Sequence, residues 1–211
     1  MPIFLETNDV FNQGVHVTAF EGNSDRQAYE EMHAKKTITP IHKGRLLTIH
    51  AESYVTSLGP VHADIVIHPG AVALIPINDK GEILLIRQWR RAVEQVLIEI
   101  PAGTLEPGEE IEVCAQRELQ EETGFRADSL HFLGTILTCP GFCTEKIHLF
   151  LARQLSFAPL PGDDHEVIDQ LPLSVDAIFE KIDSGHITDA KTIAALLYYL
   201  RWQKKQEEMR L

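Results

Sequence analysis

Three glutamates, Glu118, Glu121 and Glu122, are spaced so that a helix would place them on one face. At about 100° of rotation per residue, Glu122 lies about 40° from Glu118 on one side and Glu121 lies about 60° away on the other. The same stripe carries the less polar residues Ile111, Cys114 and Ala115. We therefore expect the three carboxylates to point toward the fold rather than into bulk water.

Such a group of like charges is unfavourable unless something compensates it. Repulsion between carboxylates three or four residues apart costs about 0.2–0.5 kcal/mol per pair on an exposed helix, and burial increases that cost. A hard divalent cation removes the penalty, because carboxylate oxygens are the ligands that Mg²⁺ and Mn²⁺ accept. The alternative is a solvated acidic helix face, which fits the apolar neighbours poorly. The pattern predicts a metal site on this helix.

The segment from residue 103 to residue 125 resembles the Nudix box, Gly-x5-Glu-x7-Arg-Glu-U-x-Glu-Glu-x-Gly-U, in which U is an apolar residue. Every position of the pattern is filled, by Gly103, Glu109, Arg117, Glu118, Leu119, Glu121, Glu122, Gly124 and Phe125. The resemblance implies a loop–helix–loop whose glutamates bind Mg²⁺, or Mn²⁺. The cation then neutralises a diphosphate and activates water.

The same resemblance implies a role for each residue of the box. Glu118 and Glu122 are expected to be the principal metal ligands, with support from Glu121 and from the backbone carbonyl of Ala102. Glu118 and Glu121 are also expected to be catalytic. Glu109 and Arg117 are expected to form an internal ion pair that fixes the loop to the helix.

The flanking sequence is similar to that of ADP-ribose pyrophosphatases, from about residue 44 to residue 200. Pro140 stands 15 residues beyond Phe125, which is typical of Nudix enzymes that prefer ADP-ribose. The resemblance implies substrate contacts from Arg87, Trp89 and Pro140, and strand position places Glu99 in the same region, where it would contact substrate or a metal-bound water. A guanidinium can bind phosphate and an indole can stack on a base. The alternatives are a core tryptophan beside solvated arginines, and a Glu99 that merely pairs with an arginine.

The implied reaction is the Mg²⁺-dependent hydrolysis of ADP-ribose to AMP and ribose 5-phosphate. One alternative is the hydrolysis of another nucleoside-diphosphate sugar, such as GDP-mannose. Another is a catalytically silent Nudix-like binding module, against which the complete set of glutamates argues. A polar loop at residues 161–166 is expected to carry the general base, with Glu166 first and Asp164 second. An ordinary surface loop is the alternative there.

The elements that must position these residues follow from hydrophobic periodicity and turn signals. A capping-box pattern at Ser24 predicts a helix to about residue 36, and short β-like runs at 44–66 predict a small antiparallel sheet. Further strands are predicted at 71–77, 82–88, 95–100, 132–138 and 147–152, and helices at 111–122, 175–184 and 190–209. Gly124 is expected to cap the second helix.

The predicted fold is α/β of the α+β kind. The resemblance implies a Nudix α/β/α sandwich with a mixed central sheet and a small N-terminal antiparallel β extension. We divide the chain into an N-terminal extension of open role (1–43), a β subdomain (44–67) and a Nudix hydrolase domain (68–211). The β subdomain would be marginal alone, so we expect a homodimer built through it.

The amino-acid composition limits the kinds of partner and the cellular compartment that we expect for this chain. The 211 residues include 31 acidic and 19 basic side chains, for a net charge of −12, which disfavours nucleic acid. No apolar run approaches the length of a membrane span, and the N-terminus does not resemble a secretory signal. The three cysteines favour reduced thiols in a cytoplasm over disulfides or a zinc site.

Overall fold

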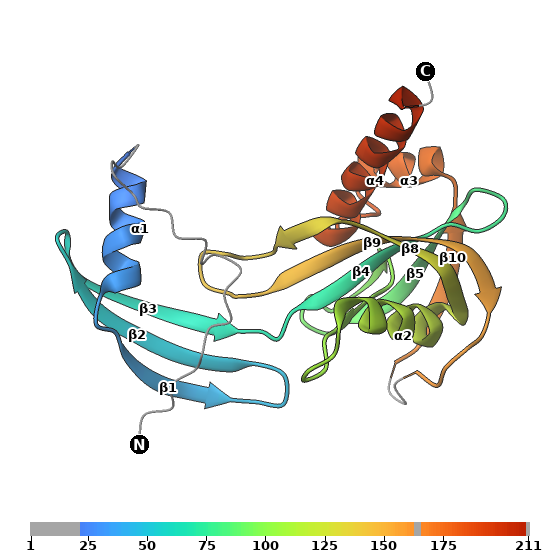
Figure 1. The fold of residues 1–211 in the computed structure, drawn as a ribbon. Coiled ribbons are helices and arrows are strands. Elements are labelled where there is room, and N and C mark those ends of the chain that lie inside the picture. The colour runs from blue at the N-terminus through green and yellow to red at the C-terminus, as the bar shows by residue number, and fades with distance from the viewer. Residues whose placement is uncertain (1–21, 163–165, 210–211) are drawn as a thin grey trace. The chain divides into compact units, whose positions relative to one another are not determined.

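The computed structural model describes residues 22–162 and 166–209 (Figure 1). By its internal contacts the chain divides into two compact units. One consists of Met1–Thr39 with Ala51–Ala63, and the other of Pro40–His50 with Asp64–Leu211. Within the described residues, no helix is both long and apolar enough to cross a membrane.

The first unit contains helix α1 (Asn23–His33) and parts of an N-terminal sheet. The sheet has the order β1-β2-β3, with β1 at Thr37–Lys43, β2 at Thr48–Thr56 and β3 at Gly59–Ile67. The hydroxyl of Tyr54 donates to Glu31 at 2.7 Å, which ties α1 to β2. The capping box expected at Ser24 is not formed, because Gly22 is the N-cap and no side chain caps the helix.

The second unit contains two sheets. The three-stranded sheet has the order β10-β5-β6, and the four-stranded sheet has the order β7-β4-β9-β8. β4 pairs in parallel with β9 and antiparallel with β7, so the central sheet is mixed as predicted. The strands are β4 (Ala71–Pro76), β5 (Ile83–Arg90), β6 (Gln95–Glu99), β7 (Ala102–Thr104), β8 (Phe125–Leu137), β9 (Lys146–Phe157) and β10 (Ile168–Leu173).

Strand β4 separates two apolar layers. Its residues are all buried, as expected for a strand covered on both faces. Val72 and Leu74 pack with the apolar side of helix α2 (Ile111–Thr123), whereas Ala73 and Ile75 pack with helices α3 (Val175–Asp183) and α4 (Ala190–Glu208). The alternation of side chains along a strand therefore gives the α/β/α arrangement.

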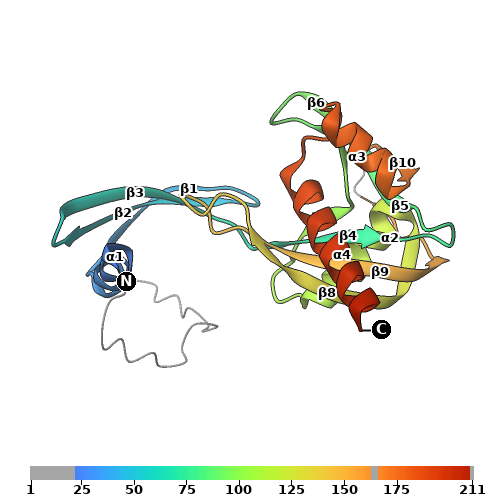
Figure 2. The same cartoon turned by 90° about the horizontal axis from the view of Figure 1, so that it is seen from above.

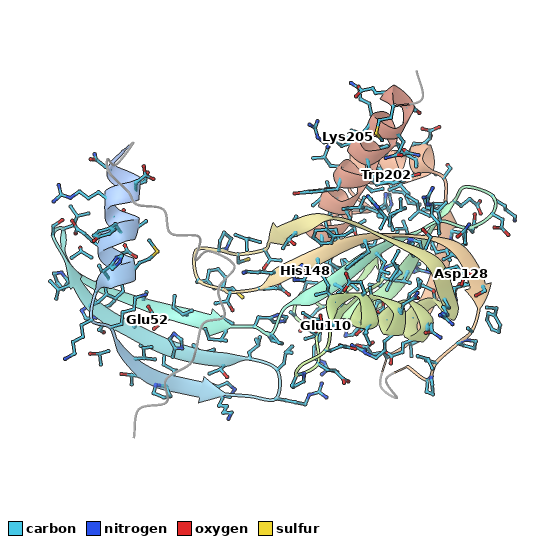
Figure 3. All side chains as sticks on the ribbon, in the orientation of Figure 1. Glu52, Glu110, Asp128, His148, Trp202 and Lys205 are labelled. Carbon is cyan, nitrogen blue, oxygen red and sulfur yellow. The ribbon has the colours of Figure 1, made fainter. Side chains whose placement is uncertain are left out.

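Specific residues cap the C-terminus of helix α2 and the N-terminus of helix α4. Gly124 caps α2 at φ 71°, in the left-handed conformation that glycine adopts readily, as predicted. Asp189 caps α4 by accepting from the backbone N–H of Thr192 at 2.9 Å. Figure 2 shows α4 running across β4, β9 and β8, and side chains such as Trp202 fill the layer between them (Figure 3).

Candidate active site

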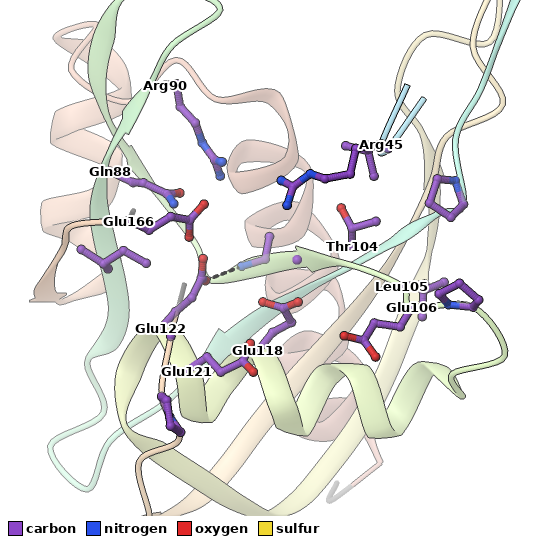
Figure 4. Close-up of a pocket in the computed structure, with 18 of the residues that line it drawn as sticks. Arg45, Gln88, Arg90, Thr104, Leu105, Glu106, Glu118, Glu121, Glu122 and Glu166 are labelled. Atoms are coloured by element: carbon purple, nitrogen blue, oxygen red, sulfur yellow. Dashed lines mark hydrogen bonds between the residues drawn. The ribbon is translucent and has the colours of Figure 1, made fainter. Parts of the chain in front are cut away.

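A cleft of about 1190 Å³ opens in the second unit, between the two ends of the segment from residue 103 to residue 125. It is lined by α2, β7, the inner face of β5, the β1–β2 connection and the segment before β10. Its acidic residues are Glu106, Glu118, Glu121, Glu122 and Glu166. Figure 4 shows the glutamates of α2 at its centre, with Gln88, Arg90 and Glu166 on one side and Arg45 and Leu105 on the other.

Helix α2 carries its carboxylates on the predicted face. Glu118 and Glu122 are each only 9% exposed, on the same side of the helix as the fully buried Cys114, Ala115 and Leu119. Glu121 is less buried and also lines the cleft. Burial raises the pKa of Glu118 above its ordinary value, although the neighbouring Arg117 lowers it in part.

Gly103 provides the space in which the Glu118 carboxylate lies. A Cβ atom at residue 103 would stand 1.8 Å from Cδ of Glu118 and 2.0 Å from its Oε1. Since real Cβ atoms do not approach other heavy atoms so closely, any residue other than glycine must displace this carboxylate. The glycine that opens the box and the glutamate 15 residues later are therefore one structural unit.

Glu122 lies deeper and is held by the backbone. Its Oε2 accepts from the backbone N–H of Ala102 at 2.8 Å (Figure 4). Burial and, to a smaller extent, the negative charges of Glu118 and Glu166 together raise the pKa of Glu122 to about 8, against the lowering effect of that hydrogen bond. This carboxyl group is thus protonated near neutral pH unless a cation replaces the proton.

Arg117 organises the rest of the box. It donates from Nε to Oε1 of Glu109 at 2.9 Å and from Nη2 to Oε2 at 2.9 Å, so the predicted internal pair is confirmed as a bidentate contact. Its Nη1 also donates to Glu118 at 2.6 Å and to Glu121 at 3.0 Å. The guanidinium lowers the pKa of Glu109 to about 2.

The donor set suits a hard divalent cation. The carboxylates of Glu118, Glu121 and Glu122 and the backbone of Ala102 line one cleft, and oxygen is the donor atom that Mg²⁺ and Mn²⁺ prefer. Within the described residues no three such side chains converge on a single point. Arg117 instead donates to both Glu118 and Glu121, and the backbone N–H of Ala102 donates to Glu122. A cation would draw them together.

Strand β5 presents different residues to the cleft from those expected. Gln88 and Arg90 line the cleft, whereas Arg87 and Trp89, which were predicted to bind substrate, do not. Trp89 is 53% exposed and stands opposite Val96 on β6. Neighbouring residues of a strand point to opposite faces of the sheet. A prediction that is wrong by one residue therefore selects the side chains that face away from the cleft in place of those that face it.

Glu99 has the plainer of its two expected roles. It is fully buried, and its carboxylate accepts from Nε and Nη2 of Arg90, each at 2.8 Å. Lys191, at the start of α4, also donates to this carboxylate and pairs with Asp189 at 3.1 Å. Burial raises the pKa of Glu99, but the two cations outweigh it and lower the pKa overall. Glu99 therefore positions the cleft arginine rather than lining the cleft itself.

The remaining predicted site residues are divided between the cleft and the surface. Glu166 lines the cleft, and its charge acts on both Glu122 and Arg90. Asp164, its alternative, lies outside the described residues. Pro140 lies in the β8–β9 connection and does not line the cleft. Sequence reasoning missed Gln88, Arg90, Arg45 and Lys191, of which the first two are within one residue of those selected.

Comparison with known proteins points to the same part of the chain. A family model described as the NUDIX domain matches residues 67–196, a range that contains every acidic residue of the cleft. An ADP-ribose pyrophosphatase of Bacillus subtilis (strain 168) is 37% identical over 169 residues, which cover 78% of this chain and 91% of that protein.

Two further comparisons cover a similar length. A methanol dehydrogenase activator of Bacillus methanolicus is 37% identical over 161 residues, or 75% of this chain and 87% of that protein. A crystal structure of an ADP compounds hydrolase has a TM-score of 0.72 and 26% identity, and the match covers 82% of this chain and 95% of that one. The likeness therefore extends over most of the second unit.

The contact between Gly103 and Glu118 generates a first prediction. Gly103→Ala should lower kcat/KM by about 100-fold or more, because the new Cβ displaces a carboxylate that the site needs. The displaced atoms end a flexible side chain, so the melting temperature should fall by only a few degrees. Gly141→Ala, which would meet no atom within 4 Å, is the control. Full activity in Gly103→Ala would contradict the role of this contact.

The raised pKa of Glu122 generates a second prediction, on pH. A cation must displace the proton that Glu122 holds below a pKa of about 8, so its apparent affinity should rise with pH. We expect an increase of about tenfold per pH unit between pH 6 and pH 8 and a plateau above. Calorimetry with Mg²⁺, in buffers of different ionisation enthalpy, measures both the affinity and the released proton. A constant affinity across this range would be inconsistent with a protonated Glu122.

Proposed function

The chain belongs to the NUDIX domain family, and on that premise we propose that it hydrolyses ADP-ribose to AMP and ribose 5-phosphate. One water molecule adds across the diphosphate bridge, and each phosphorus leaves with one product. The observation that carries the proposal is the buried carboxylate of Glu118 over Gly103, in a cleft that also contains Glu122 and Arg90. The likeness to an ADP-ribose pyrophosphatase supports the choice of substrate.

The cation we propose is Mg²⁺, with Mn²⁺ as a substitute. Glu118 and Glu122 would hold it, with Glu121 and the carbonyl of Ala102 as further ligands. When bound, the cation supplies charge neutralisation of the diphosphate and activation of water. Binding of the cation would release the proton of Glu122 and would compete with Arg117 for the carboxylate of Glu118.

Two cationic side chains would hold the substrate. Arg90 faces the cleft with its guanidinium fixed by Glu99, which leaves less side-chain entropy to lose when it binds a phosphate oxygen. Arg45 extends into the cleft from the β1–β2 connection (Figure 4). In an acidic protein, these charges are the local compensation that a polyanionic substrate requires.

Glu166 would act as the general base. It lines the cleft beside Glu122 and Arg90, within the segment that precedes β10. There its carboxylate would accept the proton that the attacking water loses as its oxygen bonds to phosphorus. A base on a connecting segment can approach when substrate is bound and withdraw when product leaves.

Substrate choice gives a third prediction. Release of phosphate from the products by a coupled phosphatase, over a panel of nucleoside-diphosphate sugars with Mg²⁺, should show ADP-ribose preferred over GDP-mannose by about tenfold or more. A preference for GDP-mannose would mean that GDP-mannose, not ADP-ribose, is the substrate, and no turnover of any member would indicate a silent binding module.

Glu118→Gln, which removes one charge at constant volume, should lose most activity. If it stays within about threefold of wild type, the metal assignment is wrong.

A fourth prediction concerns the base. Glu166→Gln should lower kcat by about 10²–10⁴-fold and leave KM nearly unchanged, because the proton is accepted only in the transition state. Glu180→Gln on α3 is the matched control outside the cleft. Asp164→Asn should have the smaller effect. If the two loop variants exchange ranks, Asp164 is the base, and a loss below tenfold in both would assign the proton to another group.

We also propose a cytoplasmic homodimer that associates through the N-terminal sheet. Free thiols at Cys114, Cys139 and Cys143 are compatible with a reducing compartment. Tyr54 is the one buried side chain among the described residues of the first unit, while Ile38, Val55 and Leu58 are exposed there. So little burial favours a partner for this unit.

Association gives a fifth prediction. Light scattering at micromolar concentration should report about twice the chain mass of 23.7 kDa. Val55→Lys should shift the population toward monomer, because a charge would be buried at the contact. A wild-type chain that remains monomeric would exclude the dimer without affecting the proposed reaction.

A further inference from the structure

Gln88 carries a buried polar group that the proposed chemistry does not use. Its side chain is 4% exposed and lines the cleft, on the face of β5 that also presents Arg90. Within the described residues, its Oε1 atom is buried and has no hydrogen-bond partner. Buried amide oxygens are nearly always paired in folded proteins, so a donor from outside the described residues is expected at this point.

Two polar neighbours of Gln88 in the cleft already donate hydrogen bonds to other groups. Arg90 donates from Nε and Nη2 to Glu99, and the amide nitrogen of Gln170 donates to the carbonyl of Thr123 at 2.8 Å. Ile168, which stands opposite Gln88 on β10, offers no side-chain donor. Glu166 lies near the Gln88 amide in Figure 4, and its carboxylate is an acceptor when ionised. A ligand group can supply what these residues do not.

We propose that Gln88 is a specificity-determining residue that accepts a hydrogen bond from a hydroxyl group of the substrate's terminal sugar. This inference rests on the proposed function, because that function places a diphosphate at the α2 carboxylates. Side chains two residues apart on one strand face are about 6.5–7 Å apart. A group that contacts Gln88 is therefore close to a phosphate held by Arg90, and in a nucleoside-diphosphate sugar that neighbouring group is a sugar.

The opposite side of the cleft is better suited to the nucleoside. Figure 4 places Arg45 and Leu105 across the α2 glutamates from Gln88 and Glu166. A guanidinium beside aliphatic carbon can stack on a planar base. The Gln88 side combines a buried amide with Arg90 and Glu166, and no aromatic side chain lines the cleft anywhere in the described residues. A hydroxyl-rich ring fits this end, and the base fits the other.

The experiment compares two compounds in the wild-type protein, in a Gln88 variant and in a control variant. The compounds are ADP-ribose and the n-butyl ester of ADP, which keeps adenosine and the diphosphate but has no terminal sugar. Gln88→Met keeps the side-chain volume and removes the amide. The variant should lower kcat/KM for ADP-ribose by about 10–100-fold and change that for the butyl ester by less than threefold. Gln203→Met on α4, outside the cleft, controls for the substitution itself.

Folding of the variant is a separate readout. Replacing an amide whose buried oxygen is unpaired by an apolar group of similar volume should leave the melting temperature unchanged or raise it. Should Gln88→Met fail to fold, wild-type kinetics with singly deoxygenated terminal riboses decide the matter. One deoxy analogue should lose about tenfold in kcat/KM, and equal rates for all analogues would overturn the proposal.

The failure modes are distinct. Equal losses for both compounds in Gln88→Met, or no loss for either, would overturn the role of Gln88 and leave the hydrolase intact. A wild-type protein that cleaves neither ADP compound would overturn the proposed function and this inference with it.

Discussion

Repulsion among the carboxylates of α2 is the constraint on which the rest of the site depends. Glu118, Glu121 and Glu122 share one helix face, and two of them are almost wholly buried. The surrounding structure provides two kinds of hydrogen-bond donor for these charges. Arg117 bridges Glu118 and Glu121, and the backbone N–H of Ala102 binds Glu122. This arrangement keeps the charges apart while leaving them free to exchange those donors for a cation.

The fold serves this arrangement by bringing β7 close to α2. Pairing of β7 with β4 places Gly103 against the helix, and the core of Val72, Leu74 and Leu119 fixes the distance between strand and helix. The glycine then admits the carboxylate where any side chain would exclude it. Packing in the apolar layer thereby sets the geometry of a polar site, which is why the box extends from a strand to the end of a helix.

Local patterns in the sequence predicted the features that local physics controls. The α2 helix, its Gly124 cap and its carboxylate face follow from spacing within about 20 residues, and the Glu109–Arg117 pair follows from the resemblance of the same segment to the Nudix box; each is confirmed. The phase of β5 is different, because Arg87 and Trp89 or Gln88 and Arg90 fit a strand equally well. Which pair faces inward is decided by β6 and β10 on either side. The short strands β7 and β10 likewise owe their existence to their partners rather than to propensity.

Contacts between distant parts of the chain could not be predicted at all. Glu99 and Lys191 are separated by 92 residues, yet Lys191 helps to neutralise the carboxylate that fixes Arg90. One consequence concerns biosynthesis. A ribosome delivers β5, β7 and α2 well before α4, so a nascent chain can contain all the box residues while its cleft arginine still lacks this support. The charge geometry of the cleft is completed only as the last helix docks.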